Sequence, residues 1–192
     1  MTKFILVGGY PAHAEDAGKG FCEELVDGFD QPVRILDCLF ARPQDTWDEV
    51  LEKDRFFFAK NLPQKVLLSC AKKEDFIEQV LKTDALYFRG GRTRELISTM
   101  KQIEGWIDSL EGKTIAGTSA GANFLAKYYY SLDDLCVYEG LGILPIKVLV
   151  HFESDYNAPN VNWKKGYTEL EAHGEDLPIV TLREGEFKVF EQ

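Results

Sequence analysis

Short apolar runs recur along the first two-thirds of the chain, and each is followed by a longer segment whose apolar residues repeat at helical spacing. The short runs are typical of strands buried in a parallel sheet, and the helical repeat is typical of amphipathic helices. The pattern predicts strands at residues 4–7, 33–36, 65–69, 85–88 and 114–118, and helices at residues 15–29, 46–60, 74–81 and 93–107. Such alternation through short connections indicates an α/β fold, a three-layer sandwich in which a mostly parallel sheet carries helices on both faces.

The last third of the chain is less regular. It predicts strands at residues 147–152, 179–182 and 187–190, a helix at residues 162–171 and a turn-rich stretch at residues 137–142. The polar sequence REGE between the last two strands is typical of a hairpin turn. The sequence shows no internal repeat and no domain linker, so we predict a single α/β domain over residues 1–192.

One predicted turn places a serine between two glycines. Gly117, Ser119 and Gly121 form the pattern G-x-S-x-G at the end of the strand predicted at residues 114–118. In a nucleophile elbow of this pattern, a sharp strand-to-helix turn exposes the serine hydroxyl, and bulky neighbours two residues away would collide. The first amides of the following helix favour negative charge at the same spot. The pattern therefore indicates that Ser119 is a candidate nucleophile.

A serine hydroxyl needs a base to take its proton, and that base is usually a histidine oriented by a carboxylate. His151 follows a predicted buried strand, so we expect it at the sheet edge where Ser119 emerges. His13 lies in a polar loop and is expected to be exposed to solvent. His173 lies at a charged helix end, where a helix C-terminal cap or an exposed loop position is expected.

Two glutamates could orient His151. Glu153 lies two residues after it, on the same face if the strand continues, and Glu184 lies in the turn after the strand predicted at residues 179–182. The residue pattern alone does not separate them.

An oxyanion hole needs two amide donors near the nucleophile. The N–H of Ala120, next to Ser119, can supply one. The Gly90-Gly91 turn at the end of the strand predicted at residues 85–88 can supply the other, because glycine lets a backbone approach closely.

Composition narrows the possible partners. The net charge of -10 argues against nucleic acid, which needs a basic surface. No apolar run is long enough to span a bilayer and no signal-peptide pattern opens the chain, so we expect no membrane contact and a cytoplasmic location. The four cysteines are dispersed and are expected to be reduced, and no metal-ligand cluster or cofactor motif appears.

Four local motifs resemble the dipeptidase E (aspartyl dipeptidase) family of serine peptidases, which are relatives of cyanophycinase and share the class I glutamine amidotransferase-like, flavodoxin-like fold. They are residues 87–93 (YFRGGRT), 117–123 (GTSAGAN), 150–152 (VHF) and 182–185 (LREG). The order and approximate spacing of these motifs agree with the family from about residue 85 onward.

The resemblance implies a role for each matching residue. Ser119 is similar to the nucleophile, His151 to its base and Glu184 to the carboxylate that orients the base. Gly91 and Ala120 are similar to the oxyanion donors. Glu153 stays an alternative, because the amidotransferase relatives place a glutamate two residues after their histidine. Those relatives carry cysteine at the elbow, so a serine there disfavours glutamine hydrolysis.

The implied substrate is a short peptide, such as a dipeptide with N-terminal aspartate, cleaved through an acyl-enzyme on Ser119. Arg92 stands where the family has asparagine, and the chain ends soon after the Glu184 turn. Both departures could change the substrate pocket, for which Arg92 and Asn123 are candidate residues. The further candidates for a basic residue that reads the substrate are Lys164, Lys165 and Arg183.

Two other readings fit the same residues. An esterase or amidase with the triad order serine, acid, histidine requires His173 as base, with Asp133 or Asp155 as acid. A catalytically silent ligand-binding protein of the same fold would account for Arg92 and the short C-terminus. The sequence predicts no oligomeric state.

Overall fold

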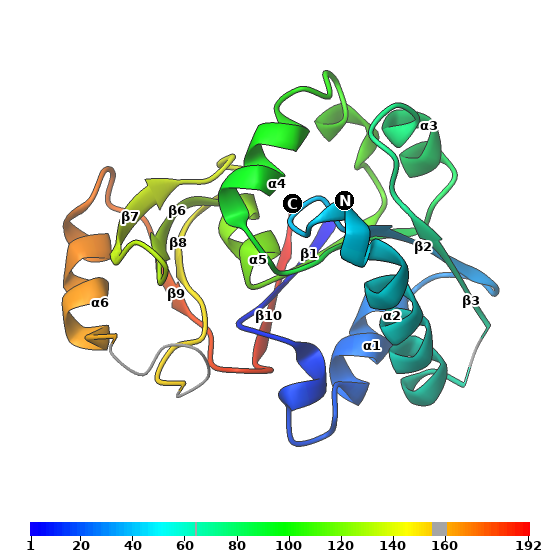
Figure 1. The fold of residues 1–192 in the computed structure, drawn as a ribbon, viewed down its shortest axis with the longest axis horizontal. Coiled ribbons are helices and arrows are strands. Elements are labelled where there is room, and N and C mark those ends of the chain that lie inside the picture. Colours follow the sequence, from blue (N-terminus) through cyan, green and yellow to red (C-terminus); the bar gives the residue numbers. More distant parts are fainter. Residues whose placement is uncertain (64, 155–160) are drawn as a thin grey trace.

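The computed structural model describes residues 1–63, 65–154 and 161–192 of the chain. The chain forms an α/β fold with two sheets, and helices pack around and between them (Figure 1). Six of the eight strand pairings are parallel, in agreement with the pattern of short apolar runs. Within the described ranges, no helix has the length and apolar character needed to cross a membrane.

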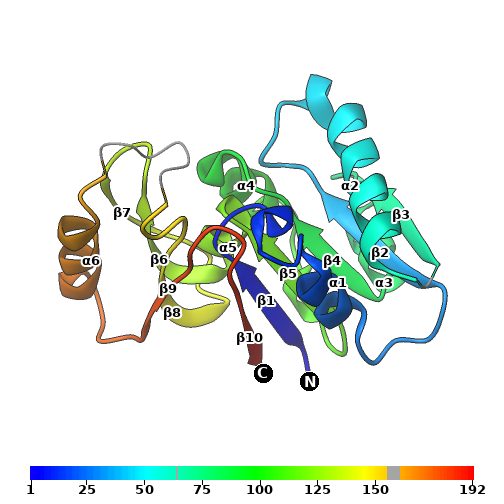
Figure 2. The same ribbon diagram turned by 90° about the horizontal axis from the view of Figure 1, so that it is seen from below.

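The first sheet has six strands in the order β10-β1-β5-β4-β2-β3, and all its neighbours are parallel except β1 and β10. Figure 2 shows β10 beside β1, with the two chain ends close together. The strands are β1 (Lys3–Val7), β2 (Val33–Cys38), β3 (Val66–Cys70), β4 (Ala85–Phe88), β5 (Thr114–Thr118) and β10 (Phe187–Glu191).

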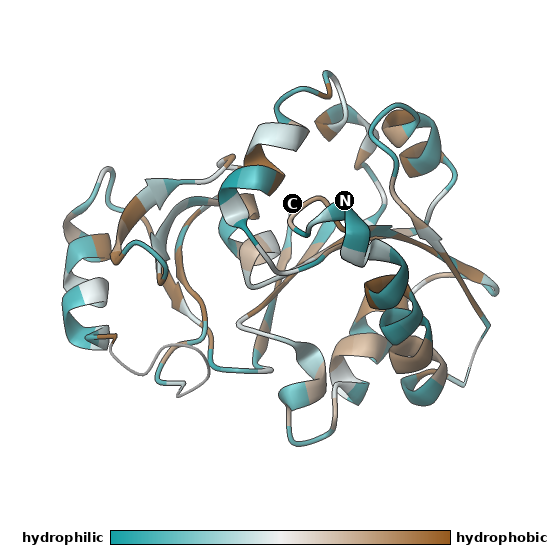
Figure 3. Cartoon of the chain, viewed as in Figure 1, coloured by the Kyte–Doolittle hydropathy of each residue, from teal (hydrophilic) through white to brown (hydrophobic). Residues whose placement is uncertain are grey.

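Helices cover both faces of this sheet, because alternate residues of its strands enter different hydrophobic clusters. Ile5 and Val7 pack in the cluster that includes α1 and α2, whereas Phe4 and Leu6 pack in the cluster that includes α3, α4 and α5. The central strands are hydrophobic, and α2 is largely hydrophilic where it faces solvent (Figure 3). The helices are α1 (Lys19–Val26), α2 (Trp47–Asn61), α3 (Phe76–Leu81), α4 (Thr93–Met100) and α5 (Ala120–Leu125).

The second sheet has four strands in the order β7-β6-β8-β9. One face packs on α6 (Trp163–Ala172), and the other packs on the cluster that contains α5. All six residues of α5 are buried, because this helix lies where both sheets meet (Figure 1). The strands are β6 (Ala126–Ser131), β7 (Cys136–Glu139), β8 (Leu144–Leu149) and β9 (Ile179–Thr181).

Two predicted helices are shorter in the structure. The first begins at Lys19, because the Asp16 carboxylate accepts hydrogen bonds from the N–H groups of Gly18 and Gly20 at 2.8 and 2.7 Å and so starts the helix late. The helix predicted at residues 93–107 ends at Met100, and the chain turns back to bury Trp106 in the core.

The predicted hairpin around residues 183–186 is wrong. The strands on either side belong to different sheets: β9 pairs with β8, and β10 pairs with β1. Residues 182–186 therefore cross from one sheet to the other. The strand predicted at residues 147–152 is β8, which ends two residues before His151.

The sequence pattern missed β6 and assigned β7 to a turn-rich stretch. Strand β6 follows α5 directly at Ala126, with no glycine, proline or polar turn to separate the two elements. It is also buried on both faces, so it lacks the polar-apolar alternation that signals a half-exposed strand.

Candidate active site

Ser119 lies between β5 and α5 in a backbone conformation that side chains rarely adopt, with φ 49° and ψ -104°. The glycines on either side are required by close packing. A Cβ on Gly117 would lie 2.5 Å from the Gly121 carbonyl oxygen, and a Cβ on Gly121 would lie 2.3 Å from the Phe88 carbonyl oxygen. The turn thus has the geometry predicted for a nucleophile elbow.

His151 lies in a turn just after β8, with φ 54°. Its N–H donates to the Gly8 carbonyl at 2.9 Å, which ties this turn to the end of β1. Its Nε2 lies 2.8 Å from Ser119 Oγ, within hydrogen-bond distance. The structure therefore brings the predicted nucleophile and the predicted base together.

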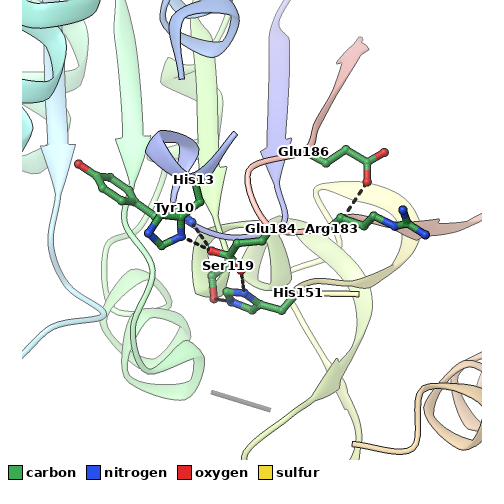
Figure 4. Close-up of polar contacts among 7 residues, drawn as sticks. All are labelled: Tyr10, His13, Ser119, His151, Arg183, Glu184 and Glu186. Atoms are coloured by element: carbon green, nitrogen blue, oxygen red, sulfur yellow. Dashed lines mark hydrogen bonds and ion pairs between the residues drawn. The ribbon is translucent and has the colours of Figure 1, made fainter. Parts of the chain in front are cut away.

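Glu184 lies on the crossover between the two sheets, and its carboxylate reaches back to His151 (Figure 4). Its Oε2 lies 2.5 Å from His151 Nδ1. Glu153 instead forms an ion pair with Arg183, and about half of its side chain is exposed. Of the two glutamates that the sequence left open, only Glu184 contacts His151 in the described part of the chain.

Several groups bind the Glu184 carboxylate and keep it charged. Burial acts to raise the pKa of Glu184, but hydrogen bonds from His151, His13 and the Tyr10 N–H outweigh it and lower the pKa to about 2. The Tyr10 N–H donates to Oε1 at 3.1 Å. The carboxylate is thus ionised at any pH at which a histidine base works.

Gly8 and Gly9 at the end of β1 make room for this arrangement. A Cβ on Gly8 would lie 2.1 Å from the Arg183 carbonyl oxygen, and a Cβ on Gly9 would lie 2.0 Å from Glu184 Oε1. In the sequence, Gly8 and Gly9 only mark the end of a strand. No sequence pattern indicates that each of them packs against a residue 175 positions away, Arg183 and Glu184 respectively.

The Gly90-Gly91 turn lies beside the elbow. The Gly90 N–H donates to Thr118 Oγ1 at 3.0 Å, and the Gly90 carbonyl accepts from Arg42 Nε at 2.5 Å. Among the described residues, no hydrogen bond engages the N–H of Gly91 or of Ala120. Both amides are therefore available to a ligand, as the oxyanion prediction requires.

A pocket of about 480 Å³ opens above Ser119. Asn123 lines it and is 6% exposed; its Nδ2 donates to Thr93 Oγ1 at 3.3 Å, and no hydrogen bond within the described residues reaches its buried Oδ1. Arg92 does not line the pocket, because its side chain is 71% exposed and pairs with Glu95. The structure thus places Asn123, but not Arg92, where the substrate-binding prediction put both.

Three other cations line the pocket: Arg42, Lys53 and Arg89. Arg89 is the buried one. Its Nε lies 3.0 Å from Asp54 Oδ2, and its guanidinium lies over the Tyr10 ring at 4.6 Å from the centroid. Burial raises the pKa of Asp54, and the Arg89 charge opposes that rise. Arg89 is thus a fixed positive charge in the pocket wall.

His13 and His173 have different surroundings in the structure. His13 Nδ1 lies 2.9 Å from Glu184 Oε1, so the expectation of a merely exposed loop residue missed a contact with the site. His173 ends α6 and packs edge-on against Tyr128, and it does not line the pocket. Of the two acids in the esterase reading, Asp133 lines the pocket, and Asp155 lies outside the described residues.

Metal ligands are not grouped in the described ranges. Within residues 1–63, 65–154 and 161–192, no three His, Cys, Asp or Glu side chains come together in a group that could hold a metal ion.

Comparisons with known proteins agree with this fold. The model of peptidase family S51 matches residues 40–191. The chain is similar to the structure of a peptidase from an acI-B1 Actinobacterium, with a TM-score of 0.71, 20% identity and coverage of 99% of this chain and 83% of that one. It is also similar to a peptidase E candidate from Listeria monocytogenes EGD-e, with a TM-score of 0.70, 16% identity and coverage of 99% and 97%.

At these identities the two structures support the fold alone, and the comparison with curated proteins found no match. The family match is stronger evidence, because it spans most of the chain and includes all four motifs. It confirms the resemblance drawn from those motifs. This chain therefore belongs to peptidase family S51, the dipeptidase E family of serine peptidases.

Proposed function

We propose that this protein cleaves short peptides through an acyl-enzyme on Ser119, with His151 as the base and Glu184 as the carboxylate that orients it. The observation that supports this best is the continuous contact from Ser119 Oγ to His151 Nε2 at 2.8 Å and from His151 Nδ1 to Glu184 Oε2 at 2.5 Å. A proton on Nδ1 would leave the Nε2 lone pair facing the serine hydroxyl, as a general base requires.

The proposed reaction has two halves. Ser119 Oγ attacks the peptide carbonyl carbon while its proton moves to His151 Nε2, and the carbonyl oxygen becomes an oxyanion. The C–N bond then breaks, and His151 returns the proton to the departing amine. Water repeats these steps on the ester: His151 takes its proton, the C–Oγ bond breaks, and the proton returns to Ser119.

The N–H groups of Gly91 and Ala120 are the proposed oxyanion donors. Ala120 follows Ser119 in the chain, Gly91 lines the same pocket as Ser119, and neither N–H is engaged by other described groups. Such donors act at the step where negative charge develops, so they stabilise the transition state more than the bound substrate.

The pocket favours a small substrate with a carboxylate. Its volume of about 480 Å³ is sufficient for a dipeptide. Arg42, Lys53 and Arg89 give one part of the wall positive charge, and Asp133 supplies a negative group that suits a free amino terminus. We therefore propose dipeptides with N-terminal aspartate as the first substrates to test.

A dipeptide library assayed with the wild type and with Ser119→Ala tests the function. We expect cleavage by the wild type, no turnover by Ser119→Ala, and the same circular dichroism spectrum for both. A fluorophosphonate probe should label the wild type only. A folded wild type that neither cleaves peptides nor takes the probe would support the silent ligand-binding alternative instead.

His151→Ala and His173→Ala separate the peptidase from the esterase reading. The peptidase proposal predicts loss of turnover in His151→Ala and wild-type turnover in His173→Ala. Loss of activity only in His173→Ala would contradict the assignment of the base.

A further inference from the structure

The Glu184 carboxylate contacts two imidazoles. Its Oε2 meets Nδ1 of His151 at 2.5 Å, and its Oε1 meets Nδ1 of His13 at 2.9 Å (Figure 4). A histidine that donates to a carboxylate through Nδ1 must carry its proton there. The carboxylate therefore binds Nδ1 of both rings. The His151 ring also faces Ser119 through its Nε2.

Close packing of the backbone fixes His13 at this place. The 3-10 turn of Pro11–His13 begins two residues after Gly9, and the His13 N–H donates to the Tyr10 carbonyl at 3.0 Å. On the opposite side, a Cβ on Gly185 would lie 2.4 Å from the Ala14 nitrogen. The loop that carries Glu184 and the loop that carries His13 are thus in direct contact.

His13 is also accessible to solvent protons. Its side chain is 40% exposed, and it lines the same pocket as Ser119. The described titratable groups in contact with it include Glu184 on the crossover and Tyr10 in its own loop, and His151 shares the Glu184 carboxylate. Arg42, Lys53, Arg89 and Asp133 line the same pocket.

The charge of His13 affects the reaction through Glu184. In the proposed mechanism, His151 becomes an imidazolium when Ser119 attacks, and the Glu184 carboxylate stabilises that charge. If His13 is neutral, it orients the carboxylate without competing for its charge. If His13 is protonated, two cations share one carboxylate, and the imidazolium on His151 forms less readily.

Resting on the function proposed above, we propose that His13 is a positioning residue that fixes Glu184 for His151 and slows the peptidase when it is protonated. It touches neither the scissile bond nor Ser119 in this role. The chain therefore uses a Ser-His-Glu arrangement with a second histidine behind the carboxylate.

Two substitutions at residue 13 separate position from charge. In His13→Asn, the amide nitrogen takes the place of Nδ1 and still donates to Glu184, but it does not titrate. In His13→Ala, the donor is lost. We expect His13→Ala to lower kcat about tenfold with little change in KM, because a hydrogen bond to a charged group is lost. His13→Asn should keep most of kcat at mildly alkaline pH.

The pH profile provides the readout that a purely structural role would not move. The wild-type kcat/KM should fall with two ionisations on the acid side, and His13→Asn with one. His173→Asn is the matched control and should retain both, because His173 follows the last residue of α6 and does not line the pocket. Wild-type kcat and pH profile in His13→Ala, or a rise in KM alone, would overturn the proposal.

A measurement without turnover keeps this test distinct from the test of the peptidase. The ¹⁵N chemical shift of imidazole Nδ1, measured by NMR at mildly alkaline pH, should change for both His13 and His151 in Glu184→Gln and stay in place for His173. If the wild type cleaves no peptide but both chemical shifts change, the coupling stands and the proposed function fails. If the His13 chemical shift does not change, the coupling itself is wrong.

Discussion

The Glu184 carboxylate occupies the space that a side chain on Gly9 would need, since a Cβ there would lie 2.0 Å from Oε1. A residue at the end of the first strand thus determines whether a residue near the other end of the chain can reach His151. The constraint is steric and local, so it can be tested by a single methyl group.

We expect Gly9→Ala to displace the Glu184 carboxylate and lower kcat about a hundredfold. This effect lies between that of losing one hydrogen bond and that of losing the orienting carboxylate altogether. The measurement is kcat with a cleaved dipeptide. Gly20→Ala is the matched control, because its Cβ would meet nothing closer than the Asp16 carboxylate at 3.0 Å, away from the pocket. Equal activity in both variants would show that the contact has no role in turnover.

The hydrogen bond between the Gly90 N–H and Thr118 Oγ1 should hold the Gly90-Gly91 turn in place. Thr118→Val keeps the shape of the side chain but leaves a buried N–H without its acceptor, which costs about 1–3 kcal/mol of folding free energy. We expect kcat to fall about tenfold as the turn shifts.

Thr2→Val is the control for that substitution, because it removes a hydrogen bond of similar length, from Thr2 Oγ1 to the Leu110 carbonyl at 3.0 Å, at the other end of the sheet. It should lower the urea midpoint without changing kcat. A Thr118→Val enzyme with normal kcat would mean that the Gly90-Gly91 turn is held by other contacts.

The depressed pKa of Glu184 predicts how stability depends on pH. Since the pKa falls from 4.5 to about 2 on folding, the charged carboxylate stabilises the folded state above pH 4.5. This contribution is lost as the pH falls from 4.5 towards 2. The difference in unfolding free energy between wild type and Glu184→Gln, measured in urea at several pH values, should therefore shrink over that window. A constant difference would contradict the assigned pKa.

We expect Arg89, and not Arg92, to bind the side-chain carboxylate of an aspartyl substrate. With the isosteric dipeptides Asp-Leu and Asn-Leu, we expect the wild type to prefer the charged one by about tenfold or more in kcat/KM, the effect of one well-placed ion pair. Arg89→Gln should remove most of this preference, whereas Arg92→Gln, which changes an exposed residue outside the pocket, should leave it intact.

Because Arg89 is buried next to Asp54, its loss could disturb folding, and Lys53→Gln provides a second test on an exposed side chain of the same pocket. It should reduce the preference for aspartate with the fold unchanged. A preference that survives in both variants would place the recognition of the carboxylate elsewhere.

The strands of the first sheet and the serine turn could be predicted because their signals are local. Apolar runs give the strands, and the spacing of Gly117, Ser119 and Gly121 gives the turn. The pairing of His151 with Glu184 needed family resemblance, because the residues lie 33 positions apart and the crossover between them was mistaken for a hairpin.

The remaining site residues depend on contacts that have no sequence pattern. His13 lies 171 positions from Glu184. Of the two arginines that flank Gly90 and Gly91, the structure buries Arg89 and exposes Arg92. Arg92 was a candidate for substrate binding because it departs from the family pattern, yet Arg89 of the same motif is the arginine that is buried in the pocket wall. Tertiary packing, not local propensity, decides between them.

The location of Glu184 on the crossover between the sheets has a mechanical consequence. Ser119 is carried by the first sheet and His151 by the end of a strand of the second, so their separation of 2.8 Å measures how the two sheets are seated on α5. The rate of turnover therefore depends on the geometry of that junction. A cavity introduced into α5 should therefore change the distance between Ser119 Oγ and His151 Nε2, and should lower kcat as well as the melting temperature.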